Sequence, residues 1–171
     1  MNSIADVTII GGGPTGLFAA FYAGMRGLST RIVDSLPELG GQLTALYPEK
    51  YIYDVGGFPK ILAKDLAQGL IRQGLQFEPE VVLDEEVHDL VREDDDTWTL
   101  RCRTGDYRSR AVVIAGGKGA FEPKVLKVPG YEELLYKGVH YAVRDPKEYE
   151  GKRVLIVGGG DSALDWALIL K

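Results

Sequence analysis

The sequence predicts a three-layer α/β protein: a domain with a mainly parallel sheet that carries antiparallel β hairpins, followed by the start of a second α/β domain. Two observations predict this architecture. Nearly the same ten letters, TIIGGGPTGL and LIVGGGDSAL, occur at 8–17 and 155–164, and each copy joins a short apolar β-branched run to an apolar helical stretch. Residues 81–115 between the copies have the alternation typical of short strands.

Composition limits the classes of protein to which the chain can belong. The 171 residues, 45% of them hydrophobic, suffice for one core and part of another. The net charge of −5 argues against a nucleic-acid partner. With Cys102 as the single cysteine, we expect neither a disulfide framework nor a metal site. No apolar stretch approaches the about 20 residues of a membrane helix, and no basic leader precedes Asp6, so we expect a cytoplasmic protein without membrane contact.

The first glycine motif has the parts of a Rossmann-like dinucleotide-binding unit. Gly11 follows an apolar strand and allows a tight turn, Gly13 allows the backbone to approach a pyrophosphate, and Gly16 allows the following helix to pack closely on the strand. The helix N-terminus offers free N–H groups to phosphates, and Pro14 suits its first turn. The binding residues predicted here are Gly11, Gly13, Pro14, Thr15 and Gly16.

An acidic residue completes this first unit. Residues 30–34 form a second predicted strand that ends in Asp34, 18 residues after Gly16. In dinucleotide-binding domains a carboxylate near this distance binds the ribose hydroxyls. The sequence therefore predicts a nucleotide site with Asp34 as its ribose ligand.

The second glycine motif repeats the context without the acid. Residues 153–157 are a predicted strand, Ala163 replaces the third glycine, and a helix is expected from Asp161 to Leu170. A complete βαβ unit takes about 30 residues or more, so we expect the chain to be a fragment, truncated within its second domain. The residues predicted to bind a second nucleotide are Gly158, Gly160, Asp161 and Ser162.

The region between the motifs suggests one more ligand contact. After Asp34, the paired glycines of Leu39-Gly40-Gly41-Gln42-Leu43 would let the backbone lie against a flat ligand, with amide hydrogen bonds from Gln42 and ring stacking from Tyr47. An ordinary surface loop is the alternative.

Other features of this region have structural interpretations. Residues 62–76 are predicted to form a supporting helix, and alternation with Trp98 and Leu100 points Cys102 toward the core. The arginines of 101–110 form either a docking patch for an acidic protein or solvated surface. Pro and Gly near residues 121–130 place a boundary between domains 1–121 and 122–171.

Together, these residues resemble the ferredoxin–NADP+ reductases of the thioredoxin-reductase-like type. The resemblance rests on IIGGGPTGLFAAFYAGMRGL, LGGQLTALYPEKYIYDVGGFPK, VVIAGG, VPG and GKRVLIVGGGDSALDWAL. It implies a homodimeric flavoprotein with an NADPH domain inserted in its FAD domain.

The resemblance also assigns roles to particular residues. Residues 11–16 would bind the FAD pyrophosphate, Asp34 the ribose, and Gln42 the flavin side, with neighbours Gly41 and Leu43. Tyr47 would lie by the flavin ring, the Val87 backbone by the adenine, and Phe121 near the flavin at the domain crossing. The second motif, with Gly158 and Gly160, would open the NADPH site.

The implied function is electron transfer between NADPH and ferredoxin through FAD, with no catalytic residue supplied by this chain. The arginines that the family uses for the 2′-phosphate of NADP would lie beyond Lys171, so the preference for NADP over NAD is inferred. The CxxC pair of thioredoxin-reducing relatives is absent, because residues 138–145 contain no cysteine. Two alternatives remain open: an NAD(P)H-dependent flavin reductase of disulfides or other acceptors, and a non-catalytic flavin-binding module if the chain ends at Lys171.

Overall fold

The chain divides into two compact units, Met1–Glu122 and Pro123–Lys171. The computed structural model describes residues 3–46, 48–119, 128–135, 137–141, 143 and 145–171. Tyr47 and Phe121, two of the predicted ligand contacts, lie outside the described residues. No helix among the described residues combines the length and the apolar character that crossing a bilayer requires.

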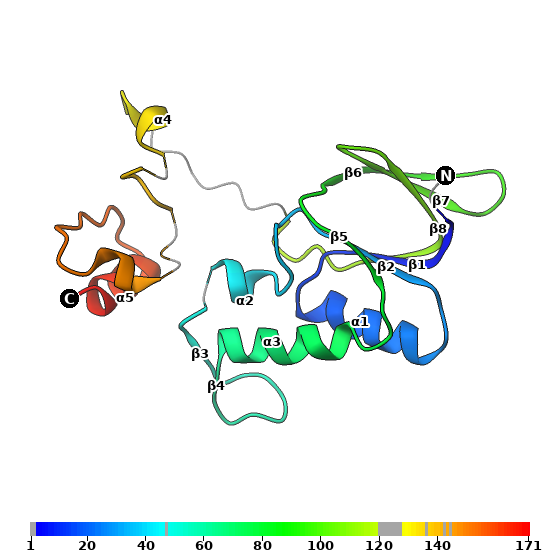
Figure 1. Cartoon of the computed structure of the whole chain (residues 1–171), viewed down its shortest axis with the longest axis horizontal. Helices are drawn as coiled ribbons and strands as arrows, with labels where there is room; N and C mark the ends of the chain where they lie inside the picture. The colour runs from blue at the N-terminus through cyan, green and yellow to red at the C-terminus, as the bar shows by residue number, and fades with distance from the viewer. Residues whose placement is uncertain (1–2, 47, 120–127, 136, 142, 144) are drawn as a thin grey trace. The chain divides into compact units, whose positions relative to one another are not determined.

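The first unit is built on a six-stranded sheet with the order β5-β2-β1-β8-β7-β6 (Figure 1). Strands β5, β2, β1 and β8 run parallel to one another, while β7 and β6 are antiparallel to their neighbours. In chain order the strands are β1 (Ala5–Ile10), β2 (Thr30–Val33), β5 (Glu80–Val82), β6 (Val87–Arg92), β7 (Trp98–Cys102) and β8 (Asp106–Ile114).

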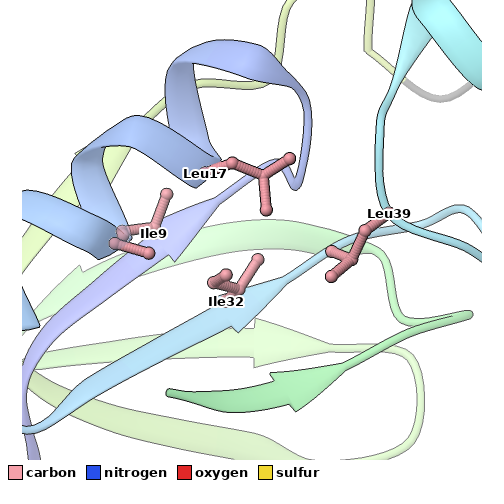
Figure 2. Close-up of a cluster of buried hydrophobic side chains, with 5 residues drawn as sticks. Ile9, Leu17, Ile32 and Leu39 are labelled. Carbon is pink, nitrogen blue, oxygen red and sulfur yellow. The ribbon is translucent and has the colours of Figure 1, made fainter. Parts of the chain in front are cut away.

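Two helices cover one face of the parallel strands (Figure 1). Helix α1 (Pro14–Met25) follows the first glycine turn, and α3 (Ala63–Gly74) lies within the predicted range 62–76. Figure 2 shows Leu17 of α1 above the strand residues Ile9 and Ile32, with Leu39 beside them. These apolar side chains are almost completely buried and form the main core.

The antiparallel strands cover the opposite face. Strand β8 is long enough to serve both parts of the sheet: residues 106–109 pair with β7, and residues 109–114 pair with β1. The resulting second core contains Val33, Leu100 and Cys102. The predicted three-layer arrangement is therefore confirmed, and so is the inward orientation of Cys102, which is 7% exposed.

Three short elements lie between β2 and α3 in the described part of the chain. Helix α2 (Gln42–Ala45) follows the paired glycines, and β3 (Tyr51–Ile52) and β4 (Ile61–Leu62) form a small antiparallel hairpin before α3. The loop containing Gly41 and Gln42 is thus the start of a helix, and it follows the strand that leads to Asp34.

The second unit has little regular structure among its described residues. It contains α4 (Tyr131–Leu134), the 3-10 helix η1 (Pro146–Tyr149) and α5 (Asp161–Ile169). Helix α5 begins at Asp161, as predicted. The strand predicted over 153–157 is wrong for this structure, since these residues form no strand. A strand needs a neighbour to satisfy its backbone groups, and the described part of this unit has no other strand. Leu155 and Val157 are accordingly 86% and 70% exposed.

Candidate functional site

A cavity of about 580 Å³ lies at the carboxyl ends of the parallel strands in the first unit. This volume falls in the range of about 300–1,000 Å³ that is usual for small-molecule and cofactor sites. The carboxyl edge is also where open α/β sheets bind their ligands. Nine of the predicted binding residues line it: Gly11, Gly13, Pro14, Thr15, Asp34, Gly41, Gln42, Leu43 and Val87.

The strand order fixes how these residues follow one another along the edge. The segment after β5 carries Val87, the end of β2 carries Asp34, the end of β1 carries the first glycine turn, and the end of β8 carries residues 115–119. The cavity therefore extends across four neighbouring strand ends, with the glycine turn between the Asp34 side and the β8 side.

The glycine turn is packed so closely that two of its positions have no room for a Cβ. A Cβ at Gly11 would lie 2.8 Å from the carbonyl carbon of Ala115, and one at Gly12 would lie 3.0 Å from the Oδ2 atom of Asp34. Gly16 lies outside the cavity lining; a Cβ there would overlap the carbonyl oxygen of Gly11. Gly16 thus allows helix α1 to pack on the turn.

Gly13 differs from these glycines because its surroundings have room for a side chain. Its φ of −77° is accessible to any residue, and a Cβ there would have its nearest contact at 3.7 Å, with the Cα of Gly41. The first helical hydrogen bond of α1 runs from the Leu17 N–H to the Gly13 carbonyl oxygen at 2.9 Å. The N–H groups of Thr15 and Gly16 precede it and remain available to an anion.

Asp34 is held in place by the backbone around it. Its carboxylate accepts hydrogen bonds from the N–H of Gly12 and from the N–H of Leu36, the latter at 2.8 Å. The side chain is 8% exposed and lines the cavity. A carboxylate oxygen accepts more than one hydrogen bond, so Asp34 retains acceptor capacity toward a ligand hydroxyl.

Glu85 is a cavity residue that the sequence analysis missed. It is 3% exposed, and its carboxylate accepts hydrogen bonds from the hydroxyl and the N–H of Thr104. The Thr104 hydroxyl holds the pKa of the Glu85 carboxyl below its usual value, although desolvation acts in the opposite direction. The Glu85 N–H also donates to the carbonyl oxygen of Asp34 at 2.9 Å. Glu85 thus links the strand end that carries Asp34 to the β7–β8 turn.

The turn after β8 was also missed as part of the site. The N–H of Gly119 donates to the carbonyl oxygen of Gly116 at 2.7 Å, and φ is 53° at Gly117 and 77° at Gly119. These values favour glycine. Lys118 lies between the two glycines and lines the cavity. The signal was present in the sequence as glycines that follow a buried parallel strand, the same pattern as in the first motif.

The second predicted nucleotide site, at the start of α5, is less complete than the cavity of the first unit. Gly158, Gly160, Asp161 and Ser162 lie together at the start of α5, where all four are exposed. Gly158 has a φ of 149°, and a Cβ there would lie 3.3 Å from the Cβ of Ala163. The turn before α5 therefore forms, but the strand expected to precede it does not. The nucleotide-binding role of these residues stays a prediction.

The arginines of residues 101–110 have partners within the first unit, which favours solvated surface over a docking patch. Their shortest contacts are 3.7 Å from Arg101 to Asp89, 2.7 Å from Arg103 to the Asp84 carbonyl oxygen, 2.7 Å from Arg108 to Asp95 and 3.6 Å from Arg110 to Asp6.

The single thiol is chemically protected. Burial raises the pKa of Cys102 to about 11, and the nearby carboxylates of Glu85 and Asp106 act in the same direction. The thiolate is the reactive form of cysteine, so Cys102 remains an unreactive thiol at neutral pH.

Comparison with protein families matches two models to the chain. Residues 63–171 match the pyridine nucleotide-disulphide oxidoreductase family, and residues 9–58 match an NAD(P)-binding Rossmann-like domain. The Rossmann-like match contains the glycine motif of residues 11–16 and Asp34. The oxidoreductase match contains the glycine motif that begins at Gly158.

Curated relatives and solved structures agree with these matches. A protein named ferredoxin--NADP reductase from Thermus thermophilus is 59% identical over 96% of this chain and 49% of its own length. Another of that name, from Halalkalibacterium halodurans, is 54% identical over 99% of this chain and 52% of its own. The chain thus spans about half the length of the curated relatives it matches. The crystal structure of T. acidophilum thioredoxin reductase matches with a TM-score of 0.75 and 27% identity, over 97% of this chain and 52% of that one.

Proposed function

Because the chain belongs to the pyridine nucleotide-disulphide oxidoreductase family, we propose that it forms the FAD-binding region and the first part of the NADPH-binding region of a ferredoxin–NADP reductase. The cavity across four strand ends, lined by the glycine turn and Asp34, is the observation that carries this proposal. The high identity to proteins named ferredoxin--NADP reductase supports it. The protein would act in the cytoplasm as a homodimer.

The cavity suits FAD in the order of its parts. The adenine would lie by the backbone of Val87, and Asp34 would accept hydrogen bonds from the adjoining ribose. The pyrophosphate would lie against Gly13 and the start of α1, where Pro14 and Thr15 face the cavity. The free N–H groups at this helix start and the missing Cβ of Gly13 are the features that fit a pyrophosphate.

The flavin end would occupy the part of the cavity beyond the glycine turn. Gly41, Gln42 and Leu43 at the start of α2 line it, together with the glycine turn after β8. When bound, FAD supplies the two-electron exchange with NADPH and delivers electrons onward to ferredoxin. The role of the chain is to bind and orient the cofactor, and Tyr47 and Phe121 remain predicted contacts.

NADPH would bind at the second glycine motif. Gly158 and Gly160 would let the backbone approach its pyrophosphate, with Asp161 and Ser162 at the start of α5. This site requires residues 153–157 to pair as a strand, which we expect once further strands of the second domain are present.

The cysteine content of this chain supports direct transfer to a ferredoxin in preference to a disulfide. A dithiol reductase needs two thiols close enough to form a disulfide, whereas this chain has Cys102 alone, buried and with a raised pKa. Electrons that leave the cofactor would therefore not pass through a cysteine pair of this chain.

The proposal can be tested in a hybrid protein. In it, this chain replaces the matching half of the Thermus thermophilus relative, to which it is 59% identical. We expect the hybrid to be purified with flavin and to reduce a ferredoxin-coupled cytochrome with NADPH, with negligible turnover of thioredoxin. The unaltered relative is the control. A flavin-loaded hybrid that reduces thioredoxin but not ferredoxin would overturn the proposed acceptor, and one that lacks flavin would overturn the proposed cofactor site.

A further inference from the structure

The charged residues of the cavity are unevenly distributed along it. Asp34, Glu85 and Glu86 supply negative charge, and Lys118 supplies the single positive charge among the described lining residues. The acids follow β2 and β5, whereas Lys118 follows β8. Because β1 lies between β2 and β8 in the sheet, the glycine turn separates the acidic end of the cavity from Lys118.

The two buried acids are already partnered by the protein. Asp34 accepts hydrogen bonds from the N–H groups of Gly12 and Leu36, and Glu85 accepts from Thr104. Lys118 has no ion pair or hydrogen bond within the described residues. Its ammonium group is thus free to interact with a negative charge in the cavity.

The backbone fixes where Lys118 stands. The hydrogen bond from Gly119 to Gly116 closes the turn, and the positive φ values of Gly117 and Gly119 set its shape. A Cβ at Gly117 would lie 3.6 Å from the side-chain Nε2 atom of Gln42. Lys118 therefore follows directly on the segment that faces Gln42, at the end of the cavity where the flavin would lie.

We propose that Lys118 stabilises the reduced, negatively charged form of the flavin relative to the oxidised form, and so raises the midpoint potential of the bound cofactor. This inference rests on the proposed function. NADPH gives up two electrons and a proton and becomes NADP+. A neutral oxidised flavin that accepts these two electrons and one proton as a hydride would carry one negative charge, and it would become neutral only by taking up a second proton from solvent. A nearby positive charge lowers the free energy of that form, and charge beside the ring is a general means of tuning a flavin.

Solvent limits the size of the effect, because the Lys118 residue is exposed. We expect the charge to favour reduced over oxidised FAD by roughly tenfold, which corresponds to about 30 mV for a two-electron couple.

The test compares Lys118→Met with the charge-conserving Lys118→Arg. A control, Arg72→Met, removes one positive charge from α3, away from the cavity lining. The dissociation constant of oxidised FAD is measured by fluorescence titration of the chain, and the midpoint potential by anaerobic equilibration with a reference dye. We expect Lys118→Met to lower the potential by about 30 mV, while Lys118→Arg and Arg72→Met keep the parent value.

The possible outcomes separate this inference from the proposed function. If Lys118→Met binds FAD with an unchanged potential, the inference fails and the proposed FAD site stands. Equal weakening of oxidised and reduced FAD would also overturn the inference, because it would show that Lys118 binds the phosphates. Failure of the unmodified chain to bind FAD would overturn the proposed function itself.

Discussion

The carboxylate of Asp34, at the end of β2, accepts a hydrogen bond from the backbone N–H of Gly12 in the turn that follows β1. The acid that would bind the ribose therefore also fixes the turn that would bind the pyrophosphate. Its second hydrogen bond, from the N–H of Leu36, fixes the chain that leads toward α2. One side chain thus positions three parts of the cavity wall.

This double role predicts two effects for Asp34→Ala. Loss of the ribose contact should weaken FAD binding roughly 10- to 100-fold. Loss of the acceptor for the buried N–H of Gly12 should lower the free energy of unfolding by about 1–3 kcal/mol. Asp34→Asn keeps one side-chain oxygen and should lose less stability. Fluorescence titration and urea unfolding measure the two effects, and unchanged FAD affinity in Asp34→Ala would restrict this residue to a structural role.

Two glycines of the same motif should respond in opposite ways. Gly13→Val should fold, because the backbone of Gly13 suits any residue and its surroundings have room, but the new side chain should fill the pyrophosphate position and abolish FAD binding. Gly16→Ala should instead destabilise the fold by several kcal/mol, on the order of a severe overpacking substitution. Circular dichroism and FAD titration distinguish the two. A Gly13→Val variant that binds FAD like the parent would contradict the assignment of this turn.

Removing the Thr104 hydroxyl should test the anchor at Glu85. Thr104→Val deprives a buried carboxylate of a hydrogen-bond donor and should lower the melting temperature by roughly 5 °C. It should also weaken FAD binding, because Glu85 lies in the connection that leads into Val87, the first residue of β6. Thr104→Ser keeps the hydroxyl and should restore both properties. If Thr104→Val and Thr104→Ser have the same melting temperature and FAD affinity, the Thr104 hydroxyl contributes to neither stability nor FAD binding.

The buried thiol predicts a specific pH dependence. The pKa of Cys102 is raised to about 11, above the unfolded value of about 8.5, so the folded state holds a proton that the unfolded state releases in this range. The stabilising effect is complete below about pH 8.5 and is lost as the pH rises toward 11. Between pH 8 and pH 10.5 the parent should lose on the order of 2 kcal/mol more than Cys102→Ala. Parallel stability curves for the two proteins would show that the thiol does not titrate as proposed.

Local patterns in the sequence were enough to predict much of the first unit. An apolar β-branched run predicted β1, apolar helical stretches predicted α1 and α3, and the spacing from the first glycine motif predicted Asp34. These features depend on residues close together in the chain. Nine predicted binding residues consequently line one cavity.

The residues that were missed depend on the order of strands in the sheet. Lys118 comes near the first glycine turn because β8 lies beside β1, and Glu85, between β5 and β6, is held by Thr104 of the β7–β8 turn. Neither of these contacts between distant parts of the chain produces a periodic pattern in the sequence. The strand expected over 153–157 was predicted but does not form. Its β-branched residues favour a strand, but a strand forms only when another strand pairs with it.

The comparison of FAD with FMN, by fluorescence titration of the purified chain, tests the central claim most directly. The adenine and its ribose are proposed to contact Val87 and Asp34, and FMN lacks both groups. FAD should therefore bind at a single site at least roughly tenfold more tightly than FMN, consistent with the loss of one or more good hydrogen bonds. Equal affinity for the two flavins, or no binding of FAD, would contradict the assignment of this cavity as an FAD site.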